Sequence, residues 1–499
     1  MPRFINDLPG VTRAYLADAE DQPFEWAVRD LAFDAPPERY AMHVLLDRTP
    51  APPLWLRTTV LEPGDDGPFS LAAELVGAKS ARLRAQRDRY RGLGFAPSAD
   101  LEAQIGRALA AAGDLAPAGD LAPAGDLAPA GDLAPPGDLA TALLRDLVAA
   151  CDALELAYAR QRPVNAAQHM GVDATRMYLT KPDRFRRYLR RLFDYATVTF
   201  YTTSTGLEDF ETVEGAYEFA SRDLLVHHLE RMGVTVEGRP LLWLHSMVAP
   251  DWMAAKDFDG LCAYLRDFIP AVVGHYRGRI GRWEVVNEAH DWADVIHLDH
   301  GQMVEAARLA CELTRATDPA VQRLISGTEP FGIYASTGAR EDGSRVNGCH
   351  WTPYTYFRDI VRAGVDFETI GVQIYVPYRD LTDIVGMLER FEALGKPVVI
   401  TELGVPGRPI EGDVHHAWTW EQQADWAEHL YTLLMSRPTI AGVLWYDLTD
   451  QWAFLPEGGL LDELSHPKPV YERIERLFVR AGRIPEPPPL DHRAGAGFV

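Results

Sequence analysis

Between residues 162 and 480, apolar runs with the length of β-strands alternate with longer amphipathic segments that have helical periodicity. Eight such runs follow in chain order: VNAAQHMG, ATVTFYT, PLLWLHS, RWEVVNEA, RLISGTE, TIGVQIYV, PVVITELG and GVLWYDL. Eight strands that are each followed by a helix are typical of a (β/α)8 barrel. A doubly wound sheet would alternate in the same way, but no glycine-rich phosphate-binding turn follows any run. The pattern therefore predicts an α/β fold with a (β/α)8 TIM barrel over residues 162–480.

The rest of the chain predicts two further units and a tail. Residues 1–95 carry short extended runs (YAMHVLLD, LWLRTTVLE and FSLAAELVG), which predict a β-rich, sandwich-like domain that packs on the barrel or binds carbohydrate. Residues 96–161 predict a helical connector. Within it, the GDLAPA repeat at 113–140 has a Pro and a Gly in each unit, which excludes a continuous helix and favours a flexible linker. Residues 481–499 are expected to form a C-terminal tail.

Charge and composition narrow the class of partner. The net charge of −23 argues against nucleic acid, and no run of apolar residues is long enough to predict a membrane span. The first residues lack a secretory signal, so we expect a cytoplasmic protein, or a secreted one if a signal was removed. The four cysteines have no metal-site spacing and predict buried free thiols. A neutral polymer or a small molecule is a better fit as partner; the oligomeric state is left open.

Polar and aromatic residues collect at the ends of the predicted strands, where barrel enzymes carry their catalytic groups. They are His169, His245, Ser246, Asn287, Glu288, Gln373, Tyr375, Glu402, Trp445 and Asp447. Glu288 ends the fourth run and Glu402 the seventh, on opposite sides of an eight-strand ring. Two carboxylates that face each other across a cavity, one protonated and one ionised, are the arrangement of a glycosidase. A gap of about 5–5.5 Å would mean retention of configuration and about 6.5–9.5 Å inversion, and these residues alone leave both open.

RWEVVNEA and VVITELGV resemble the two active-site signatures of glycoside hydrolase family 10, the xylanase family of clan A. Further segments follow in the family's order, among them LFDYATVTFY, GRPLLWLHSMVAPDWM, IGVQIYV and LWYDLTDQWAFLP. The resemblance covers residues 162–480. It implies a retaining hydrolase of β-1,4-linked xylan or xylo-oligosaccharides that works by double displacement and needs no cofactor.

The same resemblance implies a role for individual residues. Glu288 would be the acid/base and Glu402 the nucleophile, while Asn287 would bond the 2-hydroxyl of the sugar that is cleaved. Gln373 would touch the nucleophile or that hydroxyl. The substrate-binding positions are Asn287, His245, Trp243, Gln373, Tyr375, Trp445 and Trp452, with the three Trp residues as aromatic walls of the cleft.

Several positions depart from the family pattern. The family's Gly-His-Thr is Gly-Arg-Pro here, with Arg239 at its centre, and its His-Ser-Gln ends in Met247. We count Arg239 among the substrate-binding residues: it would pair with an acidic sugar such as a uronic acid, or neutralise a carboxylate such as Glu329. The departures leave two alternatives open. One is a clan A glycosidase on another β-glycan or oligosaccharide, and the other a carbohydrate-binding protein without catalysis.

Overall fold

The structure is a computed structural model of the whole chain. It describes residues 4–486 with the exception of 25–27, 29–30, 32, 34–35, 37, 49–50, 63–68, 114–136, 181, 204–208, 291–293, 341–344, 347–350, 376–377 and 412–417.

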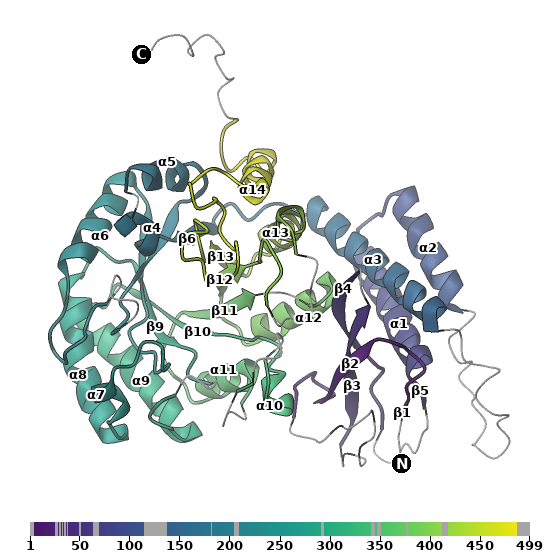
Figure 1. Cartoon of the computed structure of the whole chain (residues 1–499), viewed down its shortest axis with the longest axis horizontal. Helices are drawn as coiled ribbons and strands as arrows, with labels where there is room; N and C mark the ends of the chain where they lie inside the picture. Colours follow the sequence, from purple (N-terminus) through teal and green to yellow (C-terminus); the bar gives the residue numbers. More distant parts are fainter. Residues whose placement is uncertain are drawn as a thin grey trace, which may run out of the picture.

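Eight parallel strands close into a barrel in which neighbours in the ring are also neighbours in the chain (Figure 1). They are β6 (His169–Asp173), β7 (Tyr195–Thr199), β8 (Thr235–Arg239), β9 (Arg282–Asn287), β10 (Gln322–Gly327), β11 (Thr369–Tyr375), β12 (Val398–Gly404) and β13 (Ile440–Trp445). The predicted TIM barrel is therefore confirmed. Strand pairing shifts register beside Gln373, between β11 and β12. Such bulges re-aim side chains at barrel rims, and this one lies where the polar residues gather.

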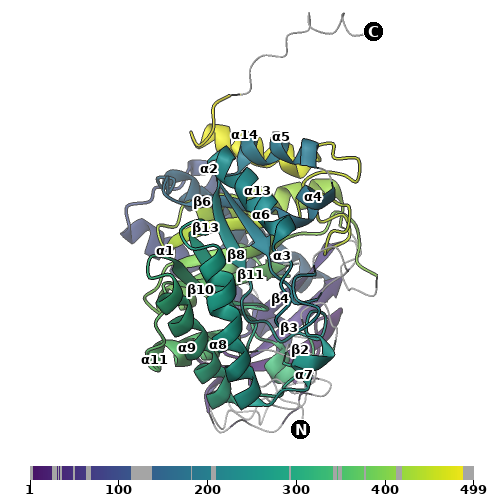
Figure 2. The ribbon, with the colours of Figure 1, turned by 90° about the vertical axis from the view of Figure 1, so that its left-hand side faces the viewer.

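The helices of the barrel follow the strands as expected. They are α4 (Thr175–Thr180), α5 (Pro182–Leu192), α6 (Ala220–Met232), α7 (Asp251–Ala254), α8 (Phe258–His275), α9 (His300–Thr317), α10 (Tyr334–Thr337), α11 (Pro353–Arg362), α12 (Leu381–Glu392), α13 (Trp420–Met435) and α14 (Pro469–Arg480). Asp and Thr side chains cap the N-termini of several helices; Asp299, for example, forms a capping box with Gln302 at α9. α14 lies beside α5, where Tyr471 contacts Tyr188 (Figures 1 and 2).

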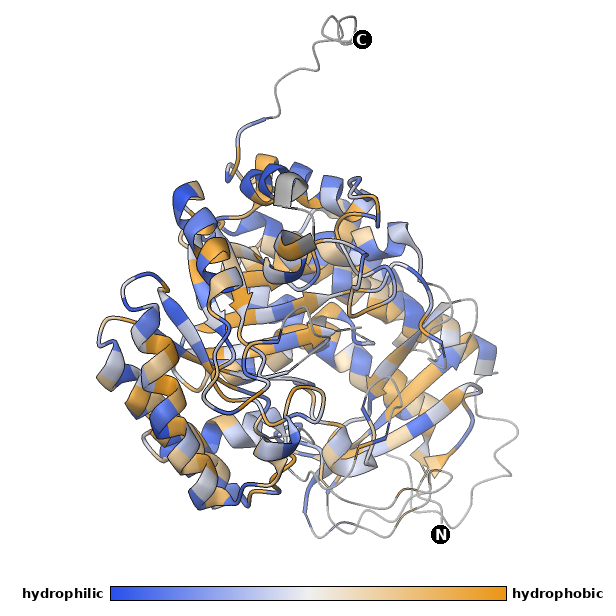
Figure 3. Cartoon of the chain, turned by 60° about the vertical axis from the view of Figure 1, so that its left-hand side comes forward, coloured by the Kyte–Doolittle hydropathy of each residue, from blue (hydrophilic) through white to orange (hydrophobic). Residues whose placement is uncertain are grey.

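Hydrophobic residues are frequent on the strands of the barrel (Figure 3). Their buried side chains form one core with the apolar side chains of the surrounding helices. Strand β9, for example, is buried along its whole length, as is usual for a parallel strand covered on both faces. None of the helices in the described part of the chain combines the length and the apolar composition that crossing a bilayer requires.

The N-terminal region is β-rich, as predicted, but its second layer is made of helices. An antiparallel sheet of β2 (Val11–Asp18), β3 (Tyr40–Arg48) and β4 (Ala51–Arg57) packs on α1 (Leu71–Gly92), α2 (Ala99–Gly113) and α3 (Gly137–Gln161); β1 (Phe4–Ile5) pairs with β5 (Phe69–Ser70). The interpretation of the run FSLAAELVG as extended is wrong beyond Ser70, because α1 begins at Leu71. The Ser70 hydroxyl accepts the amide of Ala73 and caps α1, and the Ala, Leu and Glu that follow favour a helix.

The predicted repeat at 113–140 lies mostly outside the described residues. Its two ends are helical, because α2 ends at Gly113 and α3 begins at Gly137. Ala140 of α3 is buried, so the C-terminal boundary of the predicted linker falls inside a helix.

The N-terminal sheet is buried on both faces. Residues on one face, such as Leu16 and Val44, share a core with α1, α2 and α3. Residues on the other face, Tyr15, Leu45 and Trp55, belong to the core of the barrel. Alternation along the strands directs neighbouring residues to these two cores. The sheet is thus a layer between the barrel and the helices α1, α2 and α3.

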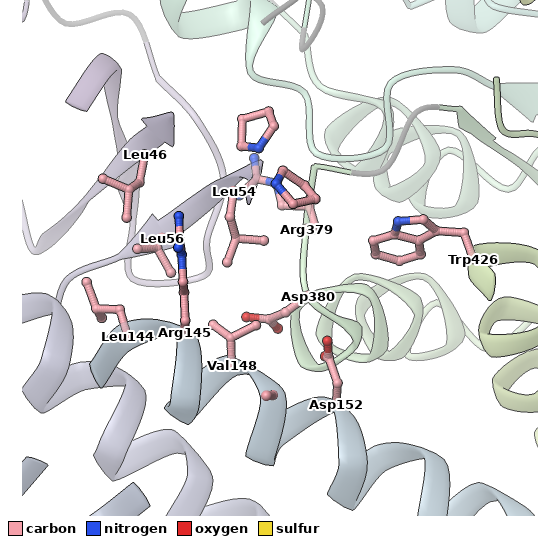
Figure 4. Close-up of a pocket in the computed structure, with 13 residues that line it drawn as sticks. Leu46, Leu54, Leu56, Leu144, Arg145, Val148, Asp152, Arg379, Asp380 and Trp426 are labelled. Atoms are coloured by element: carbon pink, nitrogen blue, oxygen red, sulfur yellow. The ribbon is translucent and has the colours of Figure 1, made fainter. Parts of the chain in front are cut away.

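Six consecutive residues, Tyr378–Asp383, are each held by the N-terminal region. The contacts are Trp55 N to Tyr378 O (2.9 Å), Arg379 to Tyr15 Oη (2.9 Å), Lys79 with Asp380, Leu381 N to Asp152 Oδ1 (2.8 Å), Arg82 to Thr382 O (2.9 Å) and Arg82 with Asp383. This segment, which we call the docking segment, leads from β11 into α12. Beside it, a hollow of about 260 Å³ opens between Leu54, Val148 and Trp426 (Figure 4).

Candidate active site

The two predicted glutamates lie at the same end of the barrel and share one amide neighbour. Gln373, near the end of β11, donates from Nε2 to Asn287 Oδ1 (3.1 Å) and to Glu402 Oε1 (3.2 Å). Asn287 ends β9 and Glu402 lies in β12, so one amide group connects three strands. The sequence predicted this group from strand ends alone, and the structure brings all its members together.

Glu402 is surrounded by donors. Its Oε2 accepts from Tyr375 Oη at 2.5 Å, and its Oε1 accepts from Gln373 and from the guanidinium of Arg239. Two neutral donors and one cation favour a charged carboxylate. The surroundings of Glu402 therefore suit a nucleophile that must be ionised before it attacks.

Glu288 has different surroundings, although it is equally buried. Its Oε2 accepts from Trp243 Nε1 at 3.0 Å, a neutral donor. Burial first, and the charge of Glu402 second, raise the pKa of Glu288 to about 7. Such a group holds a proton near neutral pH and can release it, as a general acid must. The residue also has a left-handed backbone (φ 51°), which only a constrained neighbourhood keeps.

Arg239 lies among the carboxyl groups of the site. Its side chain is only 1% exposed and is paired with Glu402 and, at 3.8 Å, with Glu284. These two carboxyl groups occupy the guanidinium, and the contact with an acidic sugar stays a prediction. The other expectation, that it neutralises a carboxylate, is right in kind, but the partners are these two glutamates instead of Glu329.

Two further positions need correction. Trp445 is 0% exposed and donates to Gly458 O (3.0 Å), so it packs in the core and offers no free face to a sugar. His169 begins β6 instead of ending it, because the strand starts later than the run VNAAQHMG suggests; its carboxyl end is Asp173. Trp445 thus ends its strand as expected but is buried there, whereas His169 lies at the opposite end of its strand.

The remaining predicted residues lie in the segments that follow β8 and β13. His245 stacks near Trp243, with ring centroids 5.3 Å apart, and its Nδ1 accepts from Met247 N (3.0 Å). Burial, and then the charge of Arg340, lowers the pKa of His245. Trp452 is 54% exposed in the loop after β13. It presents a flat apolar face, as does the equally exposed Phe454.

Sequence reasoning missed an aromatic group on the neighbouring strands. Tyr201 follows β7 and Tyr446 follows β13, and their hydroxyls lie 3.3 Å apart. The ring of Tyr446 covers the guanidinium of Arg239 at 5.6 Å, and Phe454 packs on Tyr375 and Tyr446. The signal was present, since Tyr446 stands between Trp445 and Asp447, both of which were selected.

In the described part of the chain, no cluster of His, Cys, Asp and Glu side chains has the arrangement of a metal site. Cys151, Cys262 and Cys311 are buried free thiols, as predicted. The fourth cysteine, Cys349, lies outside the described residues.

Residues 165–322 and 345–477, together more than half of the chain, match the family model of Glycosyl hydrolase family 10. Endo-1,4-beta-xylanase B of Thermotoga neapolitana is 26% identical over 291 residues, which cover 54% of this chain and 74% of that protein. Endo-1,4-beta-xylanase 3 of Hypocrea jecorina is 24% identical over 273 residues, 54% of this chain and 71% of that one.

Solved structures agree on the fold. Native xylanase 10B of Thermotoga maritima superposes with a TM-score of 0.51 at 22% identity, and covers 63% of this chain and 96% of its own. Native xylanase 10C of Cellvibrio japonicus gives a TM-score of 0.51 at 18% identity, over 64% of this chain and 72% of its own. The family match begins at residue 165 and leaves the N-terminal region outside it.

Proposed function

The chain belongs to glycosyl hydrolase family 10, and from this premise we propose that it cleaves the β-1,4 links of xylan or xylo-oligosaccharides with retention of configuration. The observation that carries the proposal is the unequal treatment of two buried carboxyl groups. Glu402 has a guanidinium and two further donors, whereas Glu288 is left with a pKa of about 7. One nucleophile and one proton donor are what a double displacement needs.

In the first step, the Glu402 carboxylate attacks the anomeric carbon while Glu288 gives its proton to the leaving glycosidic oxygen. Gln373 and Tyr375 fix the attacking carboxylate through their hydrogen bonds to it. Asn287 accepts a hydrogen bond from the same Gln373 amide. Its own NH2 group is left to donate to the sugar hydroxyl beside the reacting carbon. The products are a glycosyl ester on Glu402 and a released alcohol.

In the second step, Glu288 acts as a base and removes a proton from the attacking water. The ester carries no charge on Glu402, so one of the two causes that raise the pKa of Glu288 disappears. Its pKa therefore falls in the intermediate, and the carboxylate persists until water arrives. Attack by this water releases the sugar and regenerates both glutamates, with Glu288 protonated again.

The proposed substrate is supported by similar proteins and by aromatic rings near the site. Relatives are named endo-1,4-beta-xylanases, and a solved relative, xylanase 10B of Thermotoga petrophila, is described in complex with xylobiose. Trp243, Trp452 and Phe454 offer ring faces on which flat sugar faces stack. The roles of His245 and of these rings in binding are part of the proposal.

A second candidate is a glycosidase of the same clan that acts on another β-glycan or on oligosaccharides. The observation in its favour is that the family's Gly-His-Thr histidine is replaced by a buried Arg239, which pairs with Glu402. At the other departure, the exposed thioether of Met247 is a weak hydrogen-bond acceptor. A protein that binds glycans without catalysis is disfavoured, because both glutamates keep surroundings suited to their roles.

Product analysis tests the proposal. We expect the full chain to release xylobiose and xylotriose from xylan, with the β-anomer formed first in proton NMR. An α-anomer formed first would overturn the retaining mechanism. Activity on another β-glycan, with none on xylan or xylo-oligosaccharides, would establish the second candidate instead.

A further inference from the structure

Arg239 and Glu284 form a buried group beneath the proposed nucleophile. The Arg239 guanidinium donates to Glu402 Oε1, and a second nitrogen donates to Thr401 O at 3.4 Å. Its third nitrogen, Nε, lies 3.8 Å from Glu284 Oε2. The aromatic ring of Tyr446 covers the guanidinium from a further side. Four residues, two of them on β12, therefore hold one cation at the base of the site.

Glu284 is an unusual neighbour for this cation. It lies on β9, it is 0% exposed, and neither carboxyl oxygen has a hydrogen-bond partner among the described residues. Arg239 Nε likewise has no hydrogen-bond partner within the part of the chain that is described. Buried polar groups in folded proteins are normally hydrogen-bonded, so an acid and an N–H that meet only as an ion pair at 3.8 Å point to a role beyond packing.

The electrostatics of this group favour one charge distribution. Burial raises the pKa of Glu284 well above its ordinary value, although Arg239 lowers it. If Glu284 is uncharged, Glu402 is the carboxylate that balances the charge of the Arg239 guanidinium. An oxygen of Glu284 still attracts the Arg239 Nε–H group. A cation held by one charged carboxylate and one neutral acid is neutral as a whole, which a dry interior tolerates.

We propose that Arg239 is a positioning residue that orients the nucleophile Glu402 and stabilises its negative charge, and that Glu284 aligns Arg239 from beneath. This inference rests on the proposed function only in naming Glu402 as the nucleophile. It assigns no contact with substrate to either residue. In this chain the basic residue acts on the enzyme's own carboxylate, and the recognition of sugar hydroxyls falls to other side chains.

The first test is the pH dependence of Arg239 variants in the full chain. Arg239→Gln removes the cation, and we expect kcat to fall about 10²–10³-fold, the usual effect of losing one preorganised donor. The acid limb of kcat/KM should move to higher pH, because a carboxylate that loses its neighbouring cation is less stable in the charged form. Arg239→Lys should recover part of both. An unmoved acid limb in Arg239→Gln would overturn the proposal.

A matched control separates this role from a contribution to folding. Arg323 on β10 is as deeply buried and is paired with Glu368, away from the two glutamates. Arg323→Gln should lower the melting temperature and leave the acid limb in place. If Arg323→Gln moved the acid limb as far as Arg239→Gln, the shift would reflect general loss of structure, and the proposal would fail.

Glu284 is tested by two substitutions of similar size. Glu284→Met removes the acceptor, and we expect about a tenfold loss of kcat and a smaller upward shift of the acid limb. Glu284→Gln keeps an oxygen acceptor without a charge, and it should recover most of that loss. Equal behaviour of the two variants would exclude a role for Glu284 in alignment.

A titration without substrate distinguishes failure of this inference from failure of the proposed function. The carboxyl ¹³C signal of Glu402, assigned by its absence in Glu402→Gln, should titrate at a higher pH in Arg239→Gln than in the wild type, because the variant lacks the cation beside this carboxylate. This result is expected even if no xylan is cleaved. Identical titration in both proteins would overturn the pairing even if xylan is cleaved.

Discussion

The docking segment and the active site both bury carboxyl groups, but they treat them in opposite ways. Asp383 in the docking segment and Glu288 in the site are both buried, and burial alone would raise both pKa values. Arg82 and Lys79 outweigh burial at Asp383 and lower its pKa to about 2. Glu288 has Glu402 as its charged neighbour, and its pKa rises to about 7.

The comparison shows that burial does not decide what a carboxyl group does. A cation within reach converts a buried acid into a fixed structural charge, and a second carboxylate converts it into a proton donor. Within the active site, Glu402 resembles the docking segment, because it has Arg239, and only Glu288 differs. Substitutions in both places test this difference.

The largest effect is expected from Glu402→Ala. Without the nucleophile no covalent intermediate forms, and kcat should fall at least about 10⁴-fold. Steady-state assays on aryl xylobiosides would measure the loss. Residual activity within tenfold of the wild type would show that another group attacks the sugar.

Glu288→Ala should have an effect that depends on the leaving group. Substrates with poor leaving groups should lose about 10²–10⁴-fold, and those with good leaving groups much less in the first step. In the wild type, kcat/KM should fall as pH rises through about 7, because the acid loses its proton. A variant that keeps this alkaline limb, or is unaffected on poor leaving groups, would contradict the assignment of Glu288 as the acid.

Breaking a buried pair in the docking segment should affect stability. Lys79→Met leaves Asp380 buried without its cation, and the free energy of unfolding should fall by about 3–5 kcal/mol. Arg89 on the same helix pairs with Glu389 but is 49% exposed, so Arg89→Met should cost less than about 1 kcal/mol. Denaturant unfolding of both variants would measure the difference. Equal losses would contradict the idea that burial sets the strength of the pair.

Glu288 should also impose a cost on stability that depends on pH. Its pKa in the folded chain, about 7, lies above the ordinary value of 4.5, so the folded state binds more protons between these values. Stability from this group is present below pH 4.5 and is lost as pH rises toward 7. Glu288→Gln removes the loss, and at pH 8 this variant should be more stable by about 1–3 kcal/mol. If the melting temperatures of both proteins changed with pH in the same way between pH 4.5 and 8, this expectation would be contradicted.

The smallest effect is expected from shortening the repeat. Deleting residues 119–130 removes two GDLAPA units and leaves α2, α3 and both buried charge groups unchanged. Because the entropy of closing a loop varies slowly with its length, stability should change by about 0.6 kcal/mol or less, and kcat hardly at all. A large loss of activity would show that the repeat takes part in the function.

The ring of strands and the two glutamates could be predicted from the sequence because they follow from local patterns. Each apolar run ends in its own polar residue, and Glu288 and Glu402 each complete such a run. Strand ends meet at one face of a barrel, so no long-range information is needed to bring these residues together.

The errors concern facts that local patterns do not contain. Strands of a parallel barrel are apolar on both faces, so the sequence LWYDL does not show which neighbour, Trp445 or Tyr446, faces the site. Arg239 and Glu402 are 163 residues apart, and no motif records that they meet. FSLAAELVG contains apolar residues that suit a strand or a helix, and the cap at Ser70 decided between them.

The N-terminal sheet, buried between its own helices and the barrel, also has an evolutionary consequence. A gene rearrangement that discarded residues 1–161 would expose the apolar surface of the barrel on which Trp55 packs. It would also leave Asp380 without Lys79. Selection would act against such a fragment as soon as it was translated. We therefore expect the two parts to be inherited together, and recombination could exchange the partner of this barrel only by rebuilding the surface between them.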